Sequence, residues 1–201
     1  MMSSTDNPVL ENEQRYRASA YALLAALLRA APDQPLLDYV SGLSADEESE
    51  IDELAEAMGE LAKAARAQDV ARLELEYNDL FIGVGRGEVV PYGSWYLTGF
   101  LMEQPLSELR DHLRAFGFER SENTREPEDH AAALFEVFSV MISEAFSLAR
   151  QQEFFQLHMQ PWLERFFADL GQARSAEFYR SVARFGAAFL KLESAYLSMQ
   201  S

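Results

Sequence analysis

Residues 127–146 read PEDHAAALFEVFSVMISEAF, and this stretch decides the fold. Apolar side chains recur in it at steps of three and four residues, which is the spacing of one face of an α-helix. Proline is accepted in the first turn of a helix, so Pro127 marks the expected start. The stretch predicts the longest clear helix of the chain, at the centre of the core. Its buried face should consist of Leu134, Phe135, Phe138, Met141, Ile142, Ala145 and Phe146.

The same spacing extends along the chain in both directions. It predicts helices over residues 14–31, 45–66, 69–81 and 105–117, two more over 154–170, and a last one from Ser175 to about residue 196. The first of them should bury a face that begins at Tyr16 and should end before Pro32 and Pro35. Ser44, Asp69 and Ser175 are the expected N-terminal caps, and Gly117 should end the helix that Pro105 begins.

No run alternates with period two for long enough to predict a sheet. The predicted fold class is therefore all-α, with about seven to nine helices in a single compact domain that spans residues 1–201. Residues 1–8 should form a loose tail.

One long segment, residues 82–103, interrupts the helical pattern. It contains five glycines and Pro91 and has no sustained period. A connection of this length inside a compact domain is usually functional. We therefore expect a functional connector, which would also serve as a hinge between two helix groups. A hinge of this kind permits a domain-swapped dimer as well as a monomer.

Composition excludes several classes of function. The chain has 33 acidic and 17 basic residues, so its net charge is −16, and it has no cysteine. The charge disfavours nucleic acid and anionic membranes and favours a cationic partner. The missing thiols exclude disulfides, cysteine-ligated metals and thiol nucleophiles. No apolar run is long enough to span a membrane, and the polar start does not fit a secretory signal, so we expect a cytoplasmic protein without membrane insertion.

The three histidines do not fall in a metal-binding motif, and we expect neither a metal nor a catalytic residue. His112 should be exposed, and His158 should lie in or beside the core. His130 falls on the buried stripe near the start of the central helix, where an imidazole needs a hydrogen-bond partner. It could belong to a network that ties the loop to the core, contact a ligand, or act as an acid or base.

Three further features each allow two interpretations. The glycines of residues 83–87 resemble a phosphate loop, but they follow a predicted helix and lack a Walker lysine, which favours a flexible turn. The aromatic residues within 91–97 either grip a partner chain or anchor the loop on the core. The acidic face of the helix over residues 45–66 is either solvated or attracts a basic ligand.

Three motifs carry a resemblance to a known family. Residues 76–81 (EYNDLF), 91–96 (PYGSWY) and 126–130 (EPEDH), in this order, make the chain similar to the TorD/DmsD-type family of redox-enzyme maturation chaperones. The resemblance covers most of the chain, including its length and its helical pattern. It implies a TorD/DmsD-like fold and a cytoplasmic chaperone, not an enzyme. Such a chaperone binds the twin-arginine signal peptide of a molybdopterin-containing oxidoreductase and assists cofactor insertion before export.

The resemblance also implies which residues bind the peptide. In the family, the groove is associated with the Leu-Phe, Pro-aromatic-x-Ser and Asp-His elements. Here these elements are Leu80, Phe81, Pro91, Tyr92, Ser94, Trp95, Asp129 and His130, flanked by Tyr77, Tyr96 and Glu126. Tyr92 stands where some members have tryptophan. A cationic, apolar signal peptide suits carboxylates beside an aromatic groove, and we expect micromolar affinity.

Other functions stay open at this point. Some family members bind guanine nucleotide weakly, and no other cofactor is implied. A chaperone of the same family could serve a respiratory nitrate reductase or formate dehydrogenase without a signal peptide, by binding another terminal segment. A nucleotide-dependent switch or hydrolase would use Asp129, His130 and the glycine loop.

Overall fold

The computed structural model describes residues 8–43, 52–84, 86–119 and 126–199. The helices of this part are α1 (Pro8–Arg29), α2 (Gln34–Ser41), α3 (Asp52–Arg66), α4 (Val70–Tyr77), α5 (Gly93–Thr98), α6 (Gln104–Ala115), α7 (Ala131–Ser143), α8 (Leu148–Phe154), α9 (Gln160–Gln172) and α10 (Phe178–Met199), with π-helical segments η1 (Asn78–Ile82) and η2 (Phe155–Met159). Because η1 extends α4, and η2 joins α8 to α9, these elements make nine continuous helices in the described ranges. The all-α prediction and its expected number of helices are confirmed.

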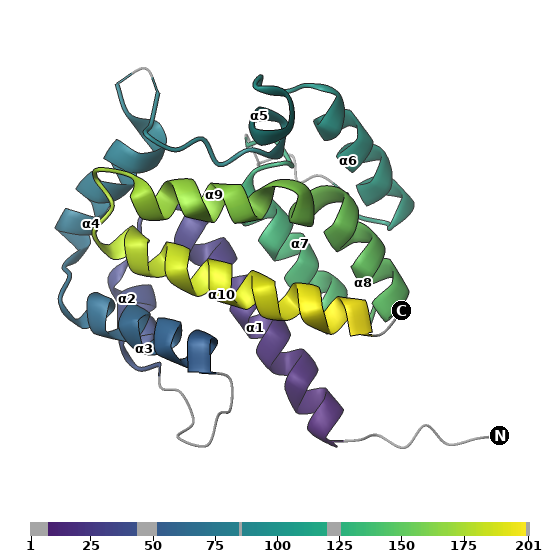
Figure 1. Ribbon diagram of the computed structural model, residues 1–201, viewed down its shortest axis with the longest axis horizontal. Coiled ribbons are helices and arrows are strands. Elements are labelled where there is room, and N and C mark those ends of the chain that lie inside the picture. Colours follow the sequence, from purple (N-terminus) through teal and green to yellow (C-terminus); the bar gives the residue numbers. More distant parts are fainter. Residues whose placement is uncertain (1–7, 44–51, 85, 120–125, 200–201) are drawn as a thin grey trace.

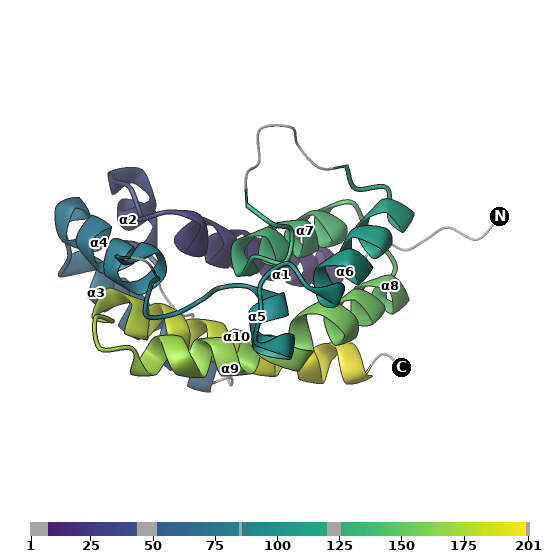
Figure 2. The same cartoon turned by 90° about the horizontal axis from the view of Figure 1, so that it is seen from above.

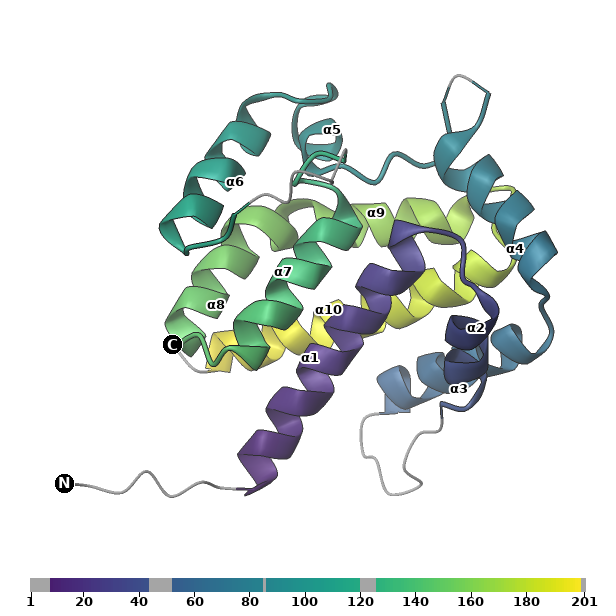
Figure 3. The same cartoon turned by 180° about the vertical axis from the view of Figure 1, so that it is seen from behind.

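The core lies between two layers of long helices. Helices α1 and α7 pack side by side in one layer, and α9 and α10 form the other (Figures 2 and 3). The Tyr21 ring of α1 lies 4.5 Å from the Phe138 ring and 4.8 Å from the Phe189 ring, measured between centroids. Burial of such large apolar side chains, at roughly 1.5–3 kcal/mol each, is the main stabilising contribution. Helices α2, α3 and α4 lie at one end of the layers, α6 and α8 lie at the other, and α5 packs on α9 between them (Figure 1).

The central helix is shorter than predicted. It begins at Ala131, not at Pro127, because His130 is its N-cap and accepts the Ala132 N–H through Nδ1 at 3.1 Å. Pro127 instead belongs to a turn in which its carbonyl accepts the His130 N–H. The helix ends at Ser143, and the exposed Ala145 has a positive φ of 55°. Helices α1 and α10, with 22 residues each, are longer.

The start of α10 contradicts the cap predicted at Ser175. Its first N–H groups point at the Glu76 carboxylate of α4, which accepts from Glu177 at 2.8 Å, Phe178 at 3.1 Å and Tyr179 at 2.8 Å. Ser175 donates its hydroxyl to Glu88 at 2.6 Å instead. A carboxylate suits the positive end of a helix dipole, but this one comes from about a hundred residues away in the chain.

Other local signals are confirmed. The Asp69 side chain caps α4 by accepting the Arg72 N–H at 3.0 Å, and Pro105 lies in the first turn of α6. Gly117 follows the end of α6 with a φ of 85°, a conformation that glycine adopts without strain. The predicted cap at Ser44 and residues 1–7 of the predicted tail lie outside the described residues.

Several expectations were wrong. Tyr16 is exposed, and Tyr21 is the tyrosine of α1 that enters the core. The sequence pattern did not reveal α2, in which Pro35 lies in the first turn, or α5, which forms inside the connector. The division expected at Pro161 is right in part, because α9 begins at Gln160 with Pro161 in its first turn, but no break separates it from the shorter helix before it. The π-helical turn of η2 carries α8 into α9 instead, and the Trp162 indole donates to the His158 carbonyl at 2.8 Å.

Candidate functional site

The connector and the start of α7 lie against each other. Tyr92 and His130 form an antiparallel bridge. On its two sides, the Gly93 N–H donates to the Asp129 carbonyl at 2.9 Å and the Ala131 N–H donates to the Pro91 carbonyl at 2.8 Å. The second and third sequence motifs, more than thirty residues apart, are therefore hydrogen-bonded to each other. Figure 3 shows α5 beside the N-terminal end of α7.

Asp129 fixes the start of α5 from inside the protein. Its side chain is only 3% exposed, and Oδ2 accepts the Ser94 N–H at 2.8 Å. Oδ1 has no hydrogen-bond partner among the described residues, which is costly for a buried carboxylate oxygen. Ser94 is fully buried, and its Oγ accepts the Met102 N–H at 3.2 Å. Both residues position the backbone of the connector.

Tyr92 and Glu126 lie at the outer edge of this junction. The half-buried Tyr92 ring stands edge-on to the His130 ring with 5.0 Å between centroids, and its hydroxyl donates to the exposed Glu126 carboxylate. Burial, together with the hydrogen bond to Glu126, raises the pKa of Tyr92 well above its ordinary value. The phenol therefore stays protonated and keeps donating at neutral pH.

His130 is buried and neutral at physiological pH. Burial lowers its pKa to about 4, although the nearby Glu126 and Asp129 charges act in the opposite direction. Because Nδ1 accepts the Ala132 N–H, the ring proton must be on Nε2. These contacts match the interpretation of His130 as part of a network that ties the loop to the core.

The first motif reaches the same neighbourhood through Tyr77. Its hydroxyl donates to the carbonyls of Leu28 at 3.2 Å and Arg29 at 3.0 Å, and its ring lies 4.9 Å from that of Phe81. The pKa of Tyr77 is raised to about 12, mainly by burial and also by the Glu126 charge, while the Arg29 charge opposes the rise. Tyr77 thus lies within electrostatic reach of the carboxylate that Tyr92 contacts.

Leu80, in contrast, is an interior residue. It is fully buried, and its carbonyl accepts the Val89 N–H at 2.9 Å, which closes the loop over residues 83–88.

The two neighbouring aromatic residues of α5 have different surroundings. Tyr96 is buried, stacks on Trp162 with 5.5 Å between centroids and donates its hydroxyl to Asp169 at 2.9 Å. Trp95 is half-buried, and the Arg86 guanidinium lies over its ring at 4.3 Å. Tyr96 therefore anchors α5 on α9, as one interpretation of the aromatic segment expects. Trp95 leaves part of its surface open, and its contact with a partner chain stays a prediction.

The eleven predicted peptide-binding residues fall into two groups. Those with accessible surface are Tyr77, Phe81, Tyr92, Trp95 and Glu126, and those that are buried are Leu80, Pro91, Ser94, Tyr96, Asp129 and His130. A peptide-contact role for any of them stays a prediction. Arg29 and Arg86, which lie close to the first group, were missed; the only available signal for Arg86 was its place between the glycines of the loop.

The glycines of this loop serve the backbone. Gly83 has a φ of 60° and donates its N–H to the Asn78 carbonyl at 2.7 Å. A Cβ on Gly87 would stand 2.5 Å from the Leu80 carbonyl oxygen, so only glycine fits there. The loop follows the π-helical η1, not a strand, and this context does not fit a phosphate-binding loop.

Two of the histidines contact each other. The prediction that His112 is exposed was wrong. Its side chain is largely covered, and its Nδ1 lies 2.8 Å from Nε2 of His158. Burial, assisted by His112, lowers the pKa of His158 to about 4. His158 lies at the edge of the core as expected. Across the described ranges, acidic residues and histidines nowhere gather in a group of three that could hold a metal ion.

Several acidic side chains of α3 form ion pairs within the protein. Glu56 and Glu60 form ion pairs with Arg184, and Glu53 pairs with Lys191, so these carboxylates face basic residues of α10. This face is therefore less available to a basic ligand than a free acidic surface would be. None of the helices in the described residues is both long and apolar enough to cross a membrane.

Known proteins are similar to this chain along most of its length. Chaperone protein TorD of Vibrio parahaemolyticus is 31% identical over 175 residues, which cover 79% of this chain and 80% of the relative. The TorD chaperone of Vibrio atlanticus is 27% identical over 210 residues, covering 93% and 96%. A candidate redox enzyme maturation protein from Archaeoglobus fulgidus has the same fold, with a TM-score of 0.59 and 22% identity over 87% of this chain and 93% of that one.

A family model described as nitrate reductase delta subunit matches residues 47–168. The chain belongs to this family, whose TorD-type members assist redox-enzyme maturation. The resemblance read from the three motifs is confirmed. The relatives are named as chaperones, and the chain is accordingly a chaperone and not an enzyme.

Proposed function

We propose that this chaperone binds the twin-arginine signal peptide of a molybdopterin-containing oxidoreductase in the cytoplasm and holds it while the cofactor is inserted. The observation that carries the proposal is the junction of the second and third motifs, which places the exposed carboxylate of Glu126 beside Tyr92. Tyr92 donates to that carboxylate, and Tyr77 lies within reach of its charge. An acidic group beside an aromatic ring suits a guanidinium ligand.

The charge of the whole chain supports the same ligand. With a net charge of −16, the protein attracts a cationic peptide over distances of about a Debye length, roughly 8–10 Å at physiological salt. The attraction should mainly increase the association rate and should weaken as salt is added.

An apolar surface beside Trp95 supports binding of the apolar middle of such a peptide. The turn between α5 and α6 exposes Phe100, Leu101 and Met102 in succession. The turn is held in place, because the Met102 N–H donates to Ser94 Oγ and the Phe100 N–H donates to Thr98 Oγ1, both at 3.2 Å. Consecutive exposed apolar residues on a fixed backbone commonly mark an interaction surface.

The test is calorimetric titration with a synthetic twin-arginine signal peptide. Glu126→Gln should weaken binding by about threefold to tenfold, because it removes one charge-assisted contact of about 1 kcal/mol. Glu53→Gln is the matched control, since it removes the same charge from an α3 residue that pairs with Lys191. Tyr92→Ala should also weaken binding without loss of helicity by circular dichroism. Unchanged affinity in both site variants would contradict the proposed site.

A second client is favoured by the description of the matching family as nitrate reductase delta subunit. In this alternative, the chaperone binds a terminal segment of a respiratory nitrate reductase that carries no twin-arginine signal. Binding that survives replacement of both signal-peptide arginines by alanine would favour it. Guanine nucleotide binding stays a prediction of the family resemblance, and titration with GTP tests it in the same instrument.

A further inference from the structure

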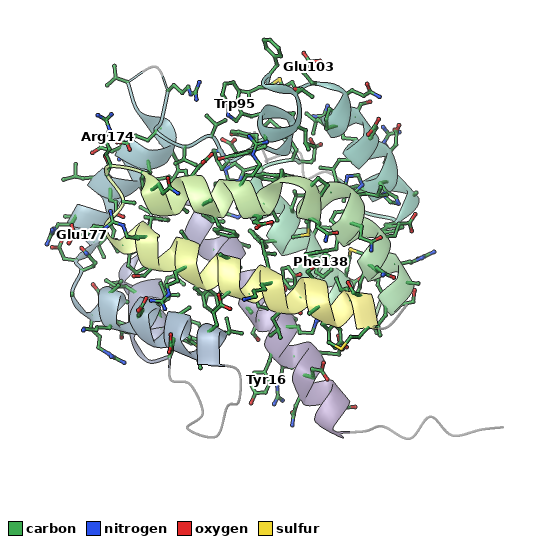
Figure 4. All side chains as sticks on the ribbon, viewed as in Figure 1. Tyr16, Trp95, Glu103, Phe138, Arg174 and Glu177 are labelled. Carbon is green, nitrogen blue, oxygen red and sulfur yellow. The ribbon has the colours of Figure 1, made fainter. Side chains whose placement is uncertain are left out.

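The contact between Arg86 and Trp95 has no role in the fold described above. The Arg86 guanidinium carbon lies 4.3 Å from the centroid of the Trp95 ring, a typical cation–π distance. In Figure 4, Trp95 lies between α5 and the loop that carries Arg86. No ion pair of the described residues involves Arg86, although the chain has 33 acidic residues. The arginine thus lies on an aromatic face instead of a carboxylate.

A neighbouring arginine shows the difference. Arg165 of α9 lies 5.6 Å from the Tyr96 ring, and it also donates to the Tyr96 carbonyl at 3.3 Å, so it belongs to the anchor of α5. Among the described residues, no hydrogen bond or ion pair of the Arg86 side chain accompanies the ring contact. Its loop is closed at the base, where the Gly83 and Val89 N–H groups donate to carbonyls of η1. The base of the loop is therefore fixed to η1, while the guanidinium can leave the ring without breaking a hydrogen bond to any described residue.

We propose that the Trp95 face is a subsite for one arginine of the bound peptide and that Arg86 occupies this subsite until the peptide displaces it. The inference rests on the proposed function and adds a built-in competitor to it. The planar guanidinium stacks on indole better than an ammonium does, so the subsite prefers arginine to lysine. Trp95 follows Ser94, which Asp129 fixes to the start of α7, so the subsite has a defined position relative to Glu126.

The peptide must displace Arg86 from the Trp95 ring, and the lost cation–π contact lowers the net affinity for the peptide. Removing the competitor should therefore strengthen binding, by about twofold to fivefold for one partly exposed cation–π contact. A general change in net charge would also affect a cationic ligand. Arg15 provides the matched control, because it carries the same charge and lies 5.9 Å from the Tyr16 ring on α1.

The experiment is titration of the full chain with a twin-arginine signal peptide and with its lysine–lysine counterpart. Arg86→Ala and Arg86→Gln should bind the arginine peptide about twofold to fivefold more tightly than the wild type, and the lysine peptide should gain less. Arg15→Ala should show a smaller gain. In a Trp95→Leu background, Arg86→Ala should no longer strengthen binding.

Each other result overturns the inference. Equal gains in Arg86→Ala and Arg15→Ala would show that net charge alone is responsible. Unchanged or weaker binding in the Arg86 variants, with tight binding by the wild type, would remove the competitor while leaving the proposed function in place. If none of the variants nor the wild type bound the peptide, the proposed function would fail together with the inference.

Discussion

The buried ion pair between α1 and α10 provides the sharpest stability prediction. Glu193 is 1% exposed and accepts from Arg17 Nε at 2.8 Å, Arg17 Nη2 at 2.7 Å and the Tyr21 hydroxyl at 3.0 Å. Arg17 also donates to Gln14 at 2.7 Å and to Gln151 of α8 at 3.1 Å. Glu193→Leu removes the anion while Arg17 stays buried, and it leaves the Tyr21 hydroxyl without its acceptor.

The expected cost follows from what remains in the core. A buried charge that loses its partner destabilises a protein by about 3–5 kcal/mol. For a chain of this length, each kcal/mol lowers the melting temperature by about 2–4 °C, so the total should be roughly 6–20 °C. The double variant Arg17→Met with Glu193→Leu removes both charges, and its stability should recover to within about 1–3 kcal/mol of the wild type, the remaining cost of the Tyr21 hydroxyl that lacks an acceptor.

Urea unfolding followed by circular dichroism measures these free energies for the wild type, the two single variants and the double variant. The reasoning is refuted if Glu193→Leu costs less than about 1 kcal/mol, or if the double variant is less stable than both single variants. Because the pair lies away from the Glu126 junction, peptide binding by the folded double variant should be unchanged.

Three other predictions concern single positions. Gly186→Ala should lower the free energy of unfolding by about 1–3 kcal/mol, because the added Cβ would stand 2.3 Å from the buried Phe167 ring. Gly59→Ala, with open space around it, should instead raise that free energy by about 0.5–1 kcal/mol, and equal urea midpoints for the two variants would contradict this pair of predictions. Glu76→Ala should cost about 1–2 kcal/mol in the same assay, because three N–H groups of α10 lose their acceptor, and no loss would disprove the long-range cap. His130 has a pKa of about 4 in the folded protein and ordinarily 6.5, so between these pH values the unfolded chain binds more protons, and the free energy of unfolding should fall as the pH drops through this range. His130→Asn, which keeps an N-cap side chain, should make this dependence of stability on pH weaker, and an unchanged dependence would contradict the prediction.

Helix positions were largely predictable from local patterns. Asp69 caps α4, Pro105 lies in the first turn of α6 and Gly117 follows its end, because each of these signals acts on the adjacent backbone. The predictions failed where a distant partner determines the backbone. Glu76 caps α10 in place of Ser175. Residues 127–130 stay outside α7, because His130 pairs with Tyr92 of the connector and the Ala131 N–H donates to the Pro91 carbonyl.

The sequence by itself determined the all-helical class, the acidic charge and the family, since periodicity, composition and motif order are properties of the chain alone. Only the tertiary structure decided which motif residues are accessible. Tyr96 and Trp95 are adjacent in the sequence, yet one anchors α5 on α9 and the other keeps an open face. Burial depends on contacts between residues far apart in the chain, and no local pattern contains that information.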